Sequence, residues 1–501
     1  MIKAPLIRAA ALAIGTFTLA SCAAAGSANA PRTVVERSGS DQRVGDENHP
    51  KILAQFGGEV ADPAIRAYVR NLGQTLASKS EQPNEKWTFT VLDSPVVNAF
   101  ALPGGYIYVT RGLIALANDE AELAGVIGHE IGHVTGAHGS KRQERATIAQ
   151  LGILGATLLG AAAGLDRDAV GAIGQLGGVV GQGYVANYSR GQEFEADTLG
   201  IRYIAKSGYD PLAGADFLES LQATSALQAK IAGSEYDPNR VDFFGSHPAT
   251  AKRVREAVGA ARREGLKDGE NAPRHRARYL DAISGMTYGD SAQQGFSRGR
   301  QFIHPEMRFM FTVPPNFKIT NSTSRVTAAG PNGAGVIFDG ARDPGGRLTN
   351  YISRTWASEI GQQTRIGRLS DLRRTRINGL DAAQAELPFN TRKGVRTARL
   401  TVIRYDGALY RFFGVQPGNS RSLARDLDRM AESFDGLSTA EARRHRPYQV
   451  RIYKVRRGDT VSELAALTPF DTFAVERFRV LNGMAPGQTL QRGELVKLIV
   501  E

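Results

Sequence analysis

The sequence is poor in cysteine, with only Cys22 among 501 residues. A single cysteine excludes a disulfide within the chain, so any structural staple must come from a bound metal. Long apolar runs are also few. The strongest run after the N-terminus, 151–164, is shorter than the roughly 20 residues of a membrane-spanning helix. For the Gly- and Ala-rich stretch 147–164 we expect a buried or site-covering helical hairpin, with membrane insertion as the alternative.

Histidine is scarce too, yet two of the 8 histidines stand in the string His-Glu-Ile-Gly-His at 129–133. Composition alone would produce such a string roughly 0.01 times in a chain of this length. On a helix of about 3.6 residues per turn, His129 and His133 share one face, and Glu130 is rotated by about 100° toward a metal-bound water. The pattern predicts half of a catalytic zinc site.

The residues around this motif favour a helix. Asn118 is the expected N-cap, and Asp119 and Glu120 suit the positive end of the helix dipole. Apolar residues follow at helical spacing and predict a buried stripe of Leu123, Val126, Ile127 and Val134.

A catalytic zinc usually takes three protein ligands, so the third must come from another segment. The segment 189–197, SRGQEFEAD, continues at helical spacing and offers Glu193. Asp197, one turn later, can accept the second ring N–H of a ligating histidine. For Glu195, which points elsewhere, we expect a surface or packing role. His138 is the alternative third ligand, because the chain comes one residue short of the HExxHxxGxxH signature.

A β-rich stretch at 96–109 precedes the motif. A strand at the edge of a sheet beside the zinc helix can pair with the backbone of a peptide, and we expect Asn98 and Ala99 to touch substrate. An internal strand followed by the turn 103–105 is the alternative.

Four separated motifs together resemble the gluzincin peptidase family of the CAAX prenyl protease, HtpX and BepA type. They are HEIGH, SRGQEFEAD, the strand-like segment Asn98–Ile114 and SHPATAKR at Ser246–Arg253, all within about 51–260. The resemblance implies one zinc ion per chain, Glu130 as general base and a supporting role for Asp197. The zinc ligands that it implies are His129, His133 and Glu193.

In the periplasmic BepA-like branch, the resemblance implies that His247 can become an extra ligand that blocks the site, with Arg253 supporting it. The implied activity is that of a zinc metalloendopeptidase that hydrolyses misfolded or misassembled envelope proteins, a form of protein quality control. A peptidoglycan-associated cell-wall hydrolase and a noncatalytic chaperone-like binder with structural zinc are the alternatives. Glu130 argues against the latter, because structural zinc needs no general base.

The N-terminus has the pattern of a bacterial lipoprotein. Two basic residues precede the apolar stretch 9–20, and Leu19–Cys22 resembles a lipobox, so we expect a signal peptide at 1–21 and lipidation of Cys22. Cleavage after Ala30 is the alternative. A polar tether is expected at 22–50.

The expected compartment is the envelope of a Gram-negative bacterium, with the protein facing the periplasm. The outer membrane is favoured because Ala23 follows the lipidated cysteine. Cleavage before Cys22 removes two basic residues and lowers the formal charge of +12 to +10. In that compartment a basic protein is expected to meet anionic lipid, lipopolysaccharide or cell-wall polymer, and not nucleic acid.

The expected fold class is α+β. A mainly helical zincin protease domain with a small edge sheet at 51–265 is followed by a linker at 266–301, which has one short helix near 279–283. A small α+β domain is expected at 302–440 and a LysM-like βααβ domain at 447–501.

In the 302–440 domain, β-rich runs at 399–405 and 409–415 flank Asp406-Gly407 and predict a hairpin. A closing amphipathic helix is expected at 423–434. A binding or positioning role and an inert scaffold are both open for this domain, and His304 is expected to be structural.

The tail resembles a LysM carbohydrate-binding module in its opening segment 453–461 and in its later turns. The segment 468–473 is longer than that pattern. The resemblance implies sugar contacts by Gly458, Asp459 and Thr460, so peptidoglycan is the partner considered for the tail.

Overall fold

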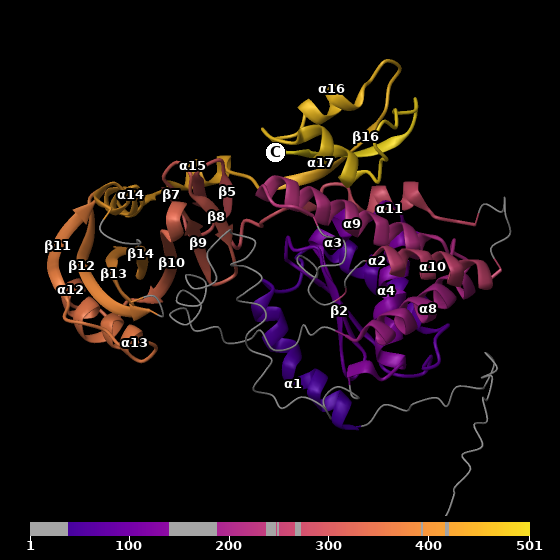
Figure 1. Cartoon of the computed structure of the whole chain (residues 1–501), viewed down its shortest axis with the longest axis horizontal. Coiled ribbons are helices and arrows are strands. Elements are labelled where there is room, and N and C mark those ends of the chain that lie inside the picture. Colours follow the sequence, from indigo (N-terminus) through magenta and orange to yellow (C-terminus); the bar gives the residue numbers. More distant parts are fainter. Residues whose placement is uncertain are drawn as a thin grey trace, which may run out of the picture. The chain divides into compact units, whose positions relative to one another are not determined.

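A computed structural model describes residues 39–139, 188–236, 247, 250–265, 272–391, 394–415 and 420–501. All of them fall within the unit 35–501. They are drawn as the coloured ribbon in Figure 1. The predicted signal peptide, the lipidation site Cys22 and the apolar stretch 147–164 lie outside the described residues. Among the helices that are described, none has both the length and the apolar character needed to cross a bilayer.

The first part of the chain is mainly helical. Its helices are α1 (Gly39–Gln55), α2 (Pro63–Ala77), α3 (Arg111–Leu116), α4 (Glu120–Thr135), α8 (Arg190–Lys206), α9 (Ala213–Ala232), α10 (Ala251–Arg263) and α11 (Arg276–Ile283). A small sheet has the strand order β1-β3-β2, where β1 (Thr88–Leu92) is parallel and β2 (Ala99–Leu102) antiparallel to β3 (Tyr106–Thr110). The small edge sheet is confirmed, and β2 lies at one of its edges.

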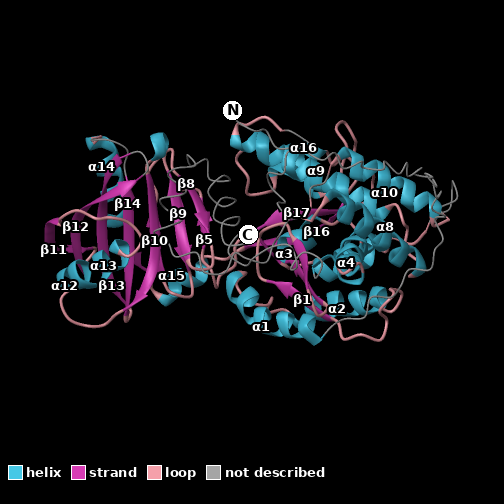
Figure 2. Cartoon of the chain, turned by 60° about the horizontal axis from the view of Figure 1, so that its bottom comes forward, coloured by secondary structure: helices cyan, strands magenta, loops and turns pink. Residues whose placement is uncertain are grey.

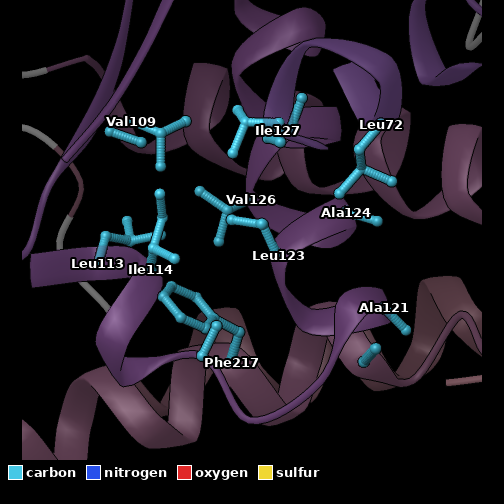
Figure 3. Close-up of a cluster of buried hydrophobic side chains, with 14 of the residues drawn as sticks. Leu72, Val109, Leu113, Ile114, Ala121, Leu123, Ala124, Val126, Ile127 and Phe217 are labelled. Atoms are coloured by element: carbon cyan, nitrogen blue, oxygen red, sulfur yellow. The ribbon is translucent and has the colours of Figure 1, made fainter. Parts of the chain in front are cut away.

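Helix α4 is the buried centre of this part. It begins after Asp119, whose side chain accepts a hydrogen bond from the backbone N–H of Glu122, so the expectation that Asn118 is the cap was wrong. Leu123 and Ile127 are fully buried, as the apolar stripe predicts. Figure 3 shows them among side chains from α2, β3, α3 and α9, including Val109 and Phe217. This apolar packing fixes the helix that carries the HEIGH motif.

Two segments expected to connect domains contain helices, and one of these helices was predicted. The expected tether at 22–50 runs into α1, which continues past its end. The expected linker at 266–301 contributes α11, where Tyr279, Leu280 and Ile283 are fully buried in the same core as α4. The short helix expected near 279–283 is therefore confirmed, and its buried side chains make it part of the peptidase core.

A second domain follows, and it begins earlier than the expected residue 302. Its first sheet has the order β15-β7-β6-β5, from β5 (Phe296–Arg298), β6 (Gln301–His304), β7 (Phe309–Thr312) and β15 (Asp435–Gly436). Its large sheet has the order β11-β12-β13-β14-β10-β9-β8, from β8 (Lys318–Asn321), β9 (Arg325–Ala329), β10 (Gly335–Arg342), β11 (Ser370–Ile377), β12 (Leu380–Thr391), β13 (Gly394–Tyr405) and β14 (Ala408–Val415).

Each face of the large sheet has its own apolar core. Figure 2 draws the strands of this sheet as magenta arrows. Helix α14 (Arg421–Glu432) packs on one face, and the short helices α12 (Leu348–Asn350) and α13 (Ala357–Gly361) pack on the other. The predicted hairpin is confirmed as β13 and β14, with Asp406 and Gly407 both at positive φ in its turn. The closing helix is also confirmed, although it ends before Phe434.

The tail has the predicted βααβ order of β16 (Tyr448–Lys454), α16 (Val461–Ala466), α17 (Ala474–Leu481) and β17 (Leu495–Val500). It packs directly on the peptidase part, because β16 also pairs with β4 (Thr287–Tyr288), and Val450 and Ile499 are buried in the same core as α4. The buried Lys497 ammonium donates to the carbonyls of Ala115, Leu116 and Ala117, which end helix α3.

Candidate active site

The site lies where α4 crosses α8 at very short range. Gly200 of α8 has no room for a side chain, because a Cβ there would lie 2.6 Å from the backbone nitrogen of His129. Gly128 and Gly132 of α4 face Gly200 and Ala196 of α8 in the same way. Small residues at the crossing therefore let the HEIGH helix and the SRGQEFEAD helix approach closely enough to share one site.

Four side chains converge there, and each offers a possible metal ligand. The candidate ligand atoms of His129, His133, Glu193 and His247 all lie within 4.8 Å of one another. The Nε2 atoms of His129 and His133 are 3.0 Å apart, and each is 3.6 Å from a carboxylate oxygen of Glu193. The structure thus brings the three predicted zinc ligands together, with His247 beside them.

The protonation pattern of these groups fits a bound cation. Asp197 Oδ1 lies 2.9 Å from Nδ1 of His129, so the proton of that ring belongs on Nδ1. Nδ1 of His133 lies 2.8 Å from Nδ1 of His138, where either ring can donate, and a metal ion on Nε2 of His133 would require the proton on Nδ1. Both Nε2 atoms then face the Glu193 carboxylate as lone pairs with no proton between them. Two imidazole lone pairs and one carboxylate are the donor set of a catalytic zinc site.

Asp197 and Arg253 support this arrangement from behind. Arg253 donates through Nε and Nη2 to the two oxygens of Asp197, at 2.9 and 2.7 Å, and its Nη1 lies 2.8 Å from Glu193 Oε2. Burial alone would raise the pKa of Asp197, but the charge and hydrogen bonds of Arg253 lower it far below its ordinary value. Asp197 therefore stays ionised and holds the ring of His129.

Glu130 is buried beside the four converging groups, with 2 % of its surface exposed. Burial raises the pKa of its carboxyl above the ordinary value. Nε2 of His247 lies 3.6 Å from Glu130, and Nδ1 of the same ring lies 2.9 Å from Glu193. His247 thus stands between the predicted base and the predicted third ligand.

An apolar pocket opens beside these groups. Asn98 and Ala99 line it, as do His129 and Glu130. Most of its remaining wall is apolar and includes Val97, Leu113, Val126, Phe217, Leu218 and Leu221. The residues expected to touch substrate therefore lie at the same cavity as the predicted base.

Three neighbouring residues differ from expectation or were missed. His138 lies outside the group of converging ligands and contacts the far nitrogen of His133, so the alternative third ligand was wrong. Glu195, expected to point elsewhere, lies 3.4 Å from His138 Nε2. Tyr188 stacks on the ring of His133, with centroids 3.8 Å apart. Its position directly before the SRGQEFEAD cap was the only sequence signal for this contact.

The residues implied as sugar contacts have structural partners in the tail. The side chain of Thr460 caps α16, and Asp459 accepts hydrogen bonds from Tyr453 OH and the Arg456 backbone. Gly458 has a positive φ of 93° in the intervening turn. These contacts account for the turn without a ligand.

The helix-borne His-Glu-x-x-His pair, the distant Glu193 and the buried Glu130 define a metallopeptidase site of the zincin type. Comparison with known families agrees, because residues 63–261 match Peptidase family M48. This part of the chain is a peptidase M48 domain.

The relatives of this chain carry protease names. The beta-barrel assembly-enhancing protease of Yersinia pestis is 32 % identical over 175 residues, which cover 34 % of this chain and 35 % of that protein. A putative beta-barrel assembly-enhancing protease of Vibrio cholerae is 30 % identical over 250 residues, 49 % of each chain. The mitochondrial metalloendopeptidase OMA1 of Homo sapiens is 29 % identical over 171 residues, covering 34 % and 31 %. The chain spans half or less of the length of these relatives.

Proposed function

We propose that this chain is a zinc-dependent metalloendopeptidase that cleaves polypeptide substrates. The observation that carries the proposal is the convergence of two imidazole lone pairs and the Glu193 carboxylate beside a buried second carboxylate, Glu130. A zinc ion held by His129, His133 and Glu193 would supply a Lewis acid that activates water and polarises the scissile carbonyl.

Glu130 acts as the general base in this proposal. Its raised pKa suits it to accept a proton from the attacking water and then to deliver that proton to the leaving amine. Asp197 keeps the ring of His129 in the tautomer that leaves Nε2 free, and Arg253 keeps Asp197 ionised.

The open edge of β2 is the proposed substrate strand. The carbonyl of Asn98 accepts from the Thr110 backbone, so the alternation of an antiparallel pair turns the backbone groups of Ala99 toward the open edge. A peptide paired there would pass beside Glu130 and could place an apolar side chain in the neighbouring pocket. This supports an extended polypeptide as the substrate.

We further propose that His247 restrains the site. Its ring occupies space between Glu130 and Glu193, where an attacking water would need to stand. Replacing His247 with Ala is expected to raise the rate of casein cleavage. A loss of activity with unchanged zinc content would instead give His247 a catalytic role.

The proposed setting is protein quality control in the bacterial envelope, on misfolded or misassembled proteins. The protease names of bacterial relatives and the lipobox-like sequence at Cys22 support this setting. A lipid-anchored form facing the periplasm, at the outer membrane, is part of the proposal. Peptidoglycan binding by the tail rests on its βααβ order and its resemblance to LysM.

Replacing Glu130 with Gln tests the proposal. Loss of the general base should lower casein cleavage by about 10²- to 10⁴-fold, while zinc content measured by mass spectrometry stays at one ion per chain. Chelation should abolish cleavage by the unsubstituted protein, and zinc should restore it. Glu219→Gln, on the exposed face of α9, is the matched control and should retain full activity. Full cleavage by Glu130→Gln would refute the role of Glu130.

A further inference from the structure

On the side of His133 away from the other ligands, its ring contacts a second histidine, which in turn contacts a carboxylate. The proposed mechanism does not use these contacts. Nδ1 of His133 lies 2.8 Å from Nδ1 of His138, and Nε2 of His138 lies 3.4 Å from Glu195. Both rings are buried, each with 1 % of its surface exposed. The two ring planes stand at 73° to each other, with centroids 5.0 Å apart.

The direction of the hydrogen bond between His133 and His138 follows from the proposed ligand role of His133. Its Nε2 faces the other ligands as a lone pair, so its proton is on Nδ1 and donates to His138 Nδ1. His138 then carries its own proton on Nε2, which faces the Glu195 carboxylate. The His133 ring therefore donates away from the metal site, and the N–H of His138 faces the Glu195 carboxylate at 3.4 Å.

The backbone after α4 is shaped to bring His138 back onto His133. Ala137 has a φ of 52°, a conformation that an L-residue with a Cβ rarely adopts. Gly136 before it has no room for a side chain, because a Cβ there would lie 2.6 Å from His138 Nε2. Gln192 of the α8 capping box donates to the His138 carbonyl at 3.4 Å. A strained turn held from both sides is typical of a functional position.

The alternate acidic residues of SRGQEFEAD then serve three different groups. Glu193 faces the other ligands, Asp197 holds His129, and Glu195 reaches His138. A hydrogen-bond acceptor on the second nitrogen of a ligating histidine orients its ring and raises its basicity toward the metal. Asp197 provides this for one histidine of HEIGH and leaves the other unsupported.

We propose that His138 and Glu195 are positioning residues that hold the ring of His133, with His138 as the acceptor of its Nδ1–H and Glu195 as the acceptor beyond. The inference rests on the proposed metal site. In this inference His138 accepts the Nδ1–H of His133, as Asp197 accepts the Nδ1–H of His129. One histidine of HEIGH is thus held by an imidazole and the other by a carboxylate.

The test measures metal binding by the full chain and not peptidase activity alone. Zinc affinity is determined by competition with a chromophoric chelator for His138→Leu, His138→Asn and Glu195→Gln. The leucine variant removes the acceptor and should bind zinc about 10- to 100-fold more weakly. The asparagine variant restores an acceptor near the position of Nδ1 and should recover most of that loss. The visible spectrum of the Co²⁺-loaded protein should change with leucine and return toward the original with asparagine.

If the leucine variant does not fold, Glu195→Gln still tests the inference. Glu195 is partly exposed, so replacing it should disturb the fold less. It should weaken zinc binding several-fold, whereas the control Glu219→Gln should not. Unchanged zinc affinity in both His138→Leu and Glu195→Gln would overturn the inference. If the unsubstituted protein bound no zinc, the proposed function itself would fail, which is a different result.

Discussion

Both domains have apolar cores, but the peptidase domain also buries a cluster of ionisable side chains. Around the crossing of α4 and α8, the interior holds ionisable groups, such as Glu130, Glu193 and Arg253, each less than 5 % exposed. Among the described residues of the second domain, the buried polar side chains are His304, Gln384 and Thr401. Burying a charge is costly unless it is paired, so a cluster of buried charges marks a place where chemistry outweighs stability.

Formal charge separates the same two regions. Residues 51–265 contain 20 Lys and Arg against 23 Asp and Glu, whereas residues 302–440 contain 20 against 12. The peptidase domain is thus slightly acidic, and the second domain carries a formal charge of +8 on a surface around aromatic cores. The candidate site lies in the peptidase domain, so we expect catalysis to be confined there and the second domain to contribute a basic surface.

The largest loss of stability is expected at Arg253, because the buried carboxylates of Asp197 and Glu193 both pair with this one cation. Arg253→Leu leaves the carboxylates of Asp197 and Glu193 buried without their cation, which should cost roughly 3–5 kcal/mol of stability. Urea unfolding followed by the fluorescence of Trp87 and Trp356 measures the loss. A loss below about 1 kcal/mol would contradict the view that Arg253 neutralises the site.

An apolar truncation in the second domain should be similarly costly for a different reason. Phe338 lies among Phe302, Phe309, Phe311 and Phe412, with ring centroids 4.7 to 6.5 Å away. Phe338→Ala should lower the free energy of unfolding by roughly 3–5 kcal/mol. Where the protein remains folded, casein cleavage per bound zinc should be unchanged. A selective loss of cleavage would contradict the confinement of catalysis to the peptidase domain.

How much of the fold and of the site could be predicted depends on how far apart in the sequence the contacting residues lie. HEIGH is recognisable because helical spacing puts His129 and His133 on one face, whereas the family resemblance is what pairs them with the distant Glu193. The contact of His138 with His133 depends on the left-handed backbone of Ala137, which no residue type announces. The burial of Tyr279 and the contact of Lys497 with the end of α3 depend on packing between segments far apart in the chain, which sequence patterns do not show.

His304 gives the second domain a pH dependence of its own. Burial lowers its pKa to about 4, and its Nδ1 accepts a hydrogen bond from the Met307 backbone, which requires the neutral ring. The unfolded chain protonates near pH 6.5 and the folded chain only near pH 4, so stability is full above pH 6.5 and is lost as the pH falls toward 4. The full effect is about 3 kcal/mol. His304→Gln should flatten this part of the stability profile, measured by urea unfolding between pH 4 and 7. An unchanged slope would contradict the assignment to His304.

The smallest effect is expected on the basic surface. Arg365, Arg368 and Arg376 are exposed beside or within the edge strand β11, and no ion pair to them is found within the described part of the chain. Replacing all three with Gln should change the free energy of unfolding by less than about 0.5 kcal/mol at each site, because exposed charges contribute little to folding. Casein cleavage should also be unchanged. Arg253→Leu removes one cation and should lower the free energy of unfolding several times more. Comparing the two variants therefore separates the buried charge that the fold requires from surface charge that contributes little to stability.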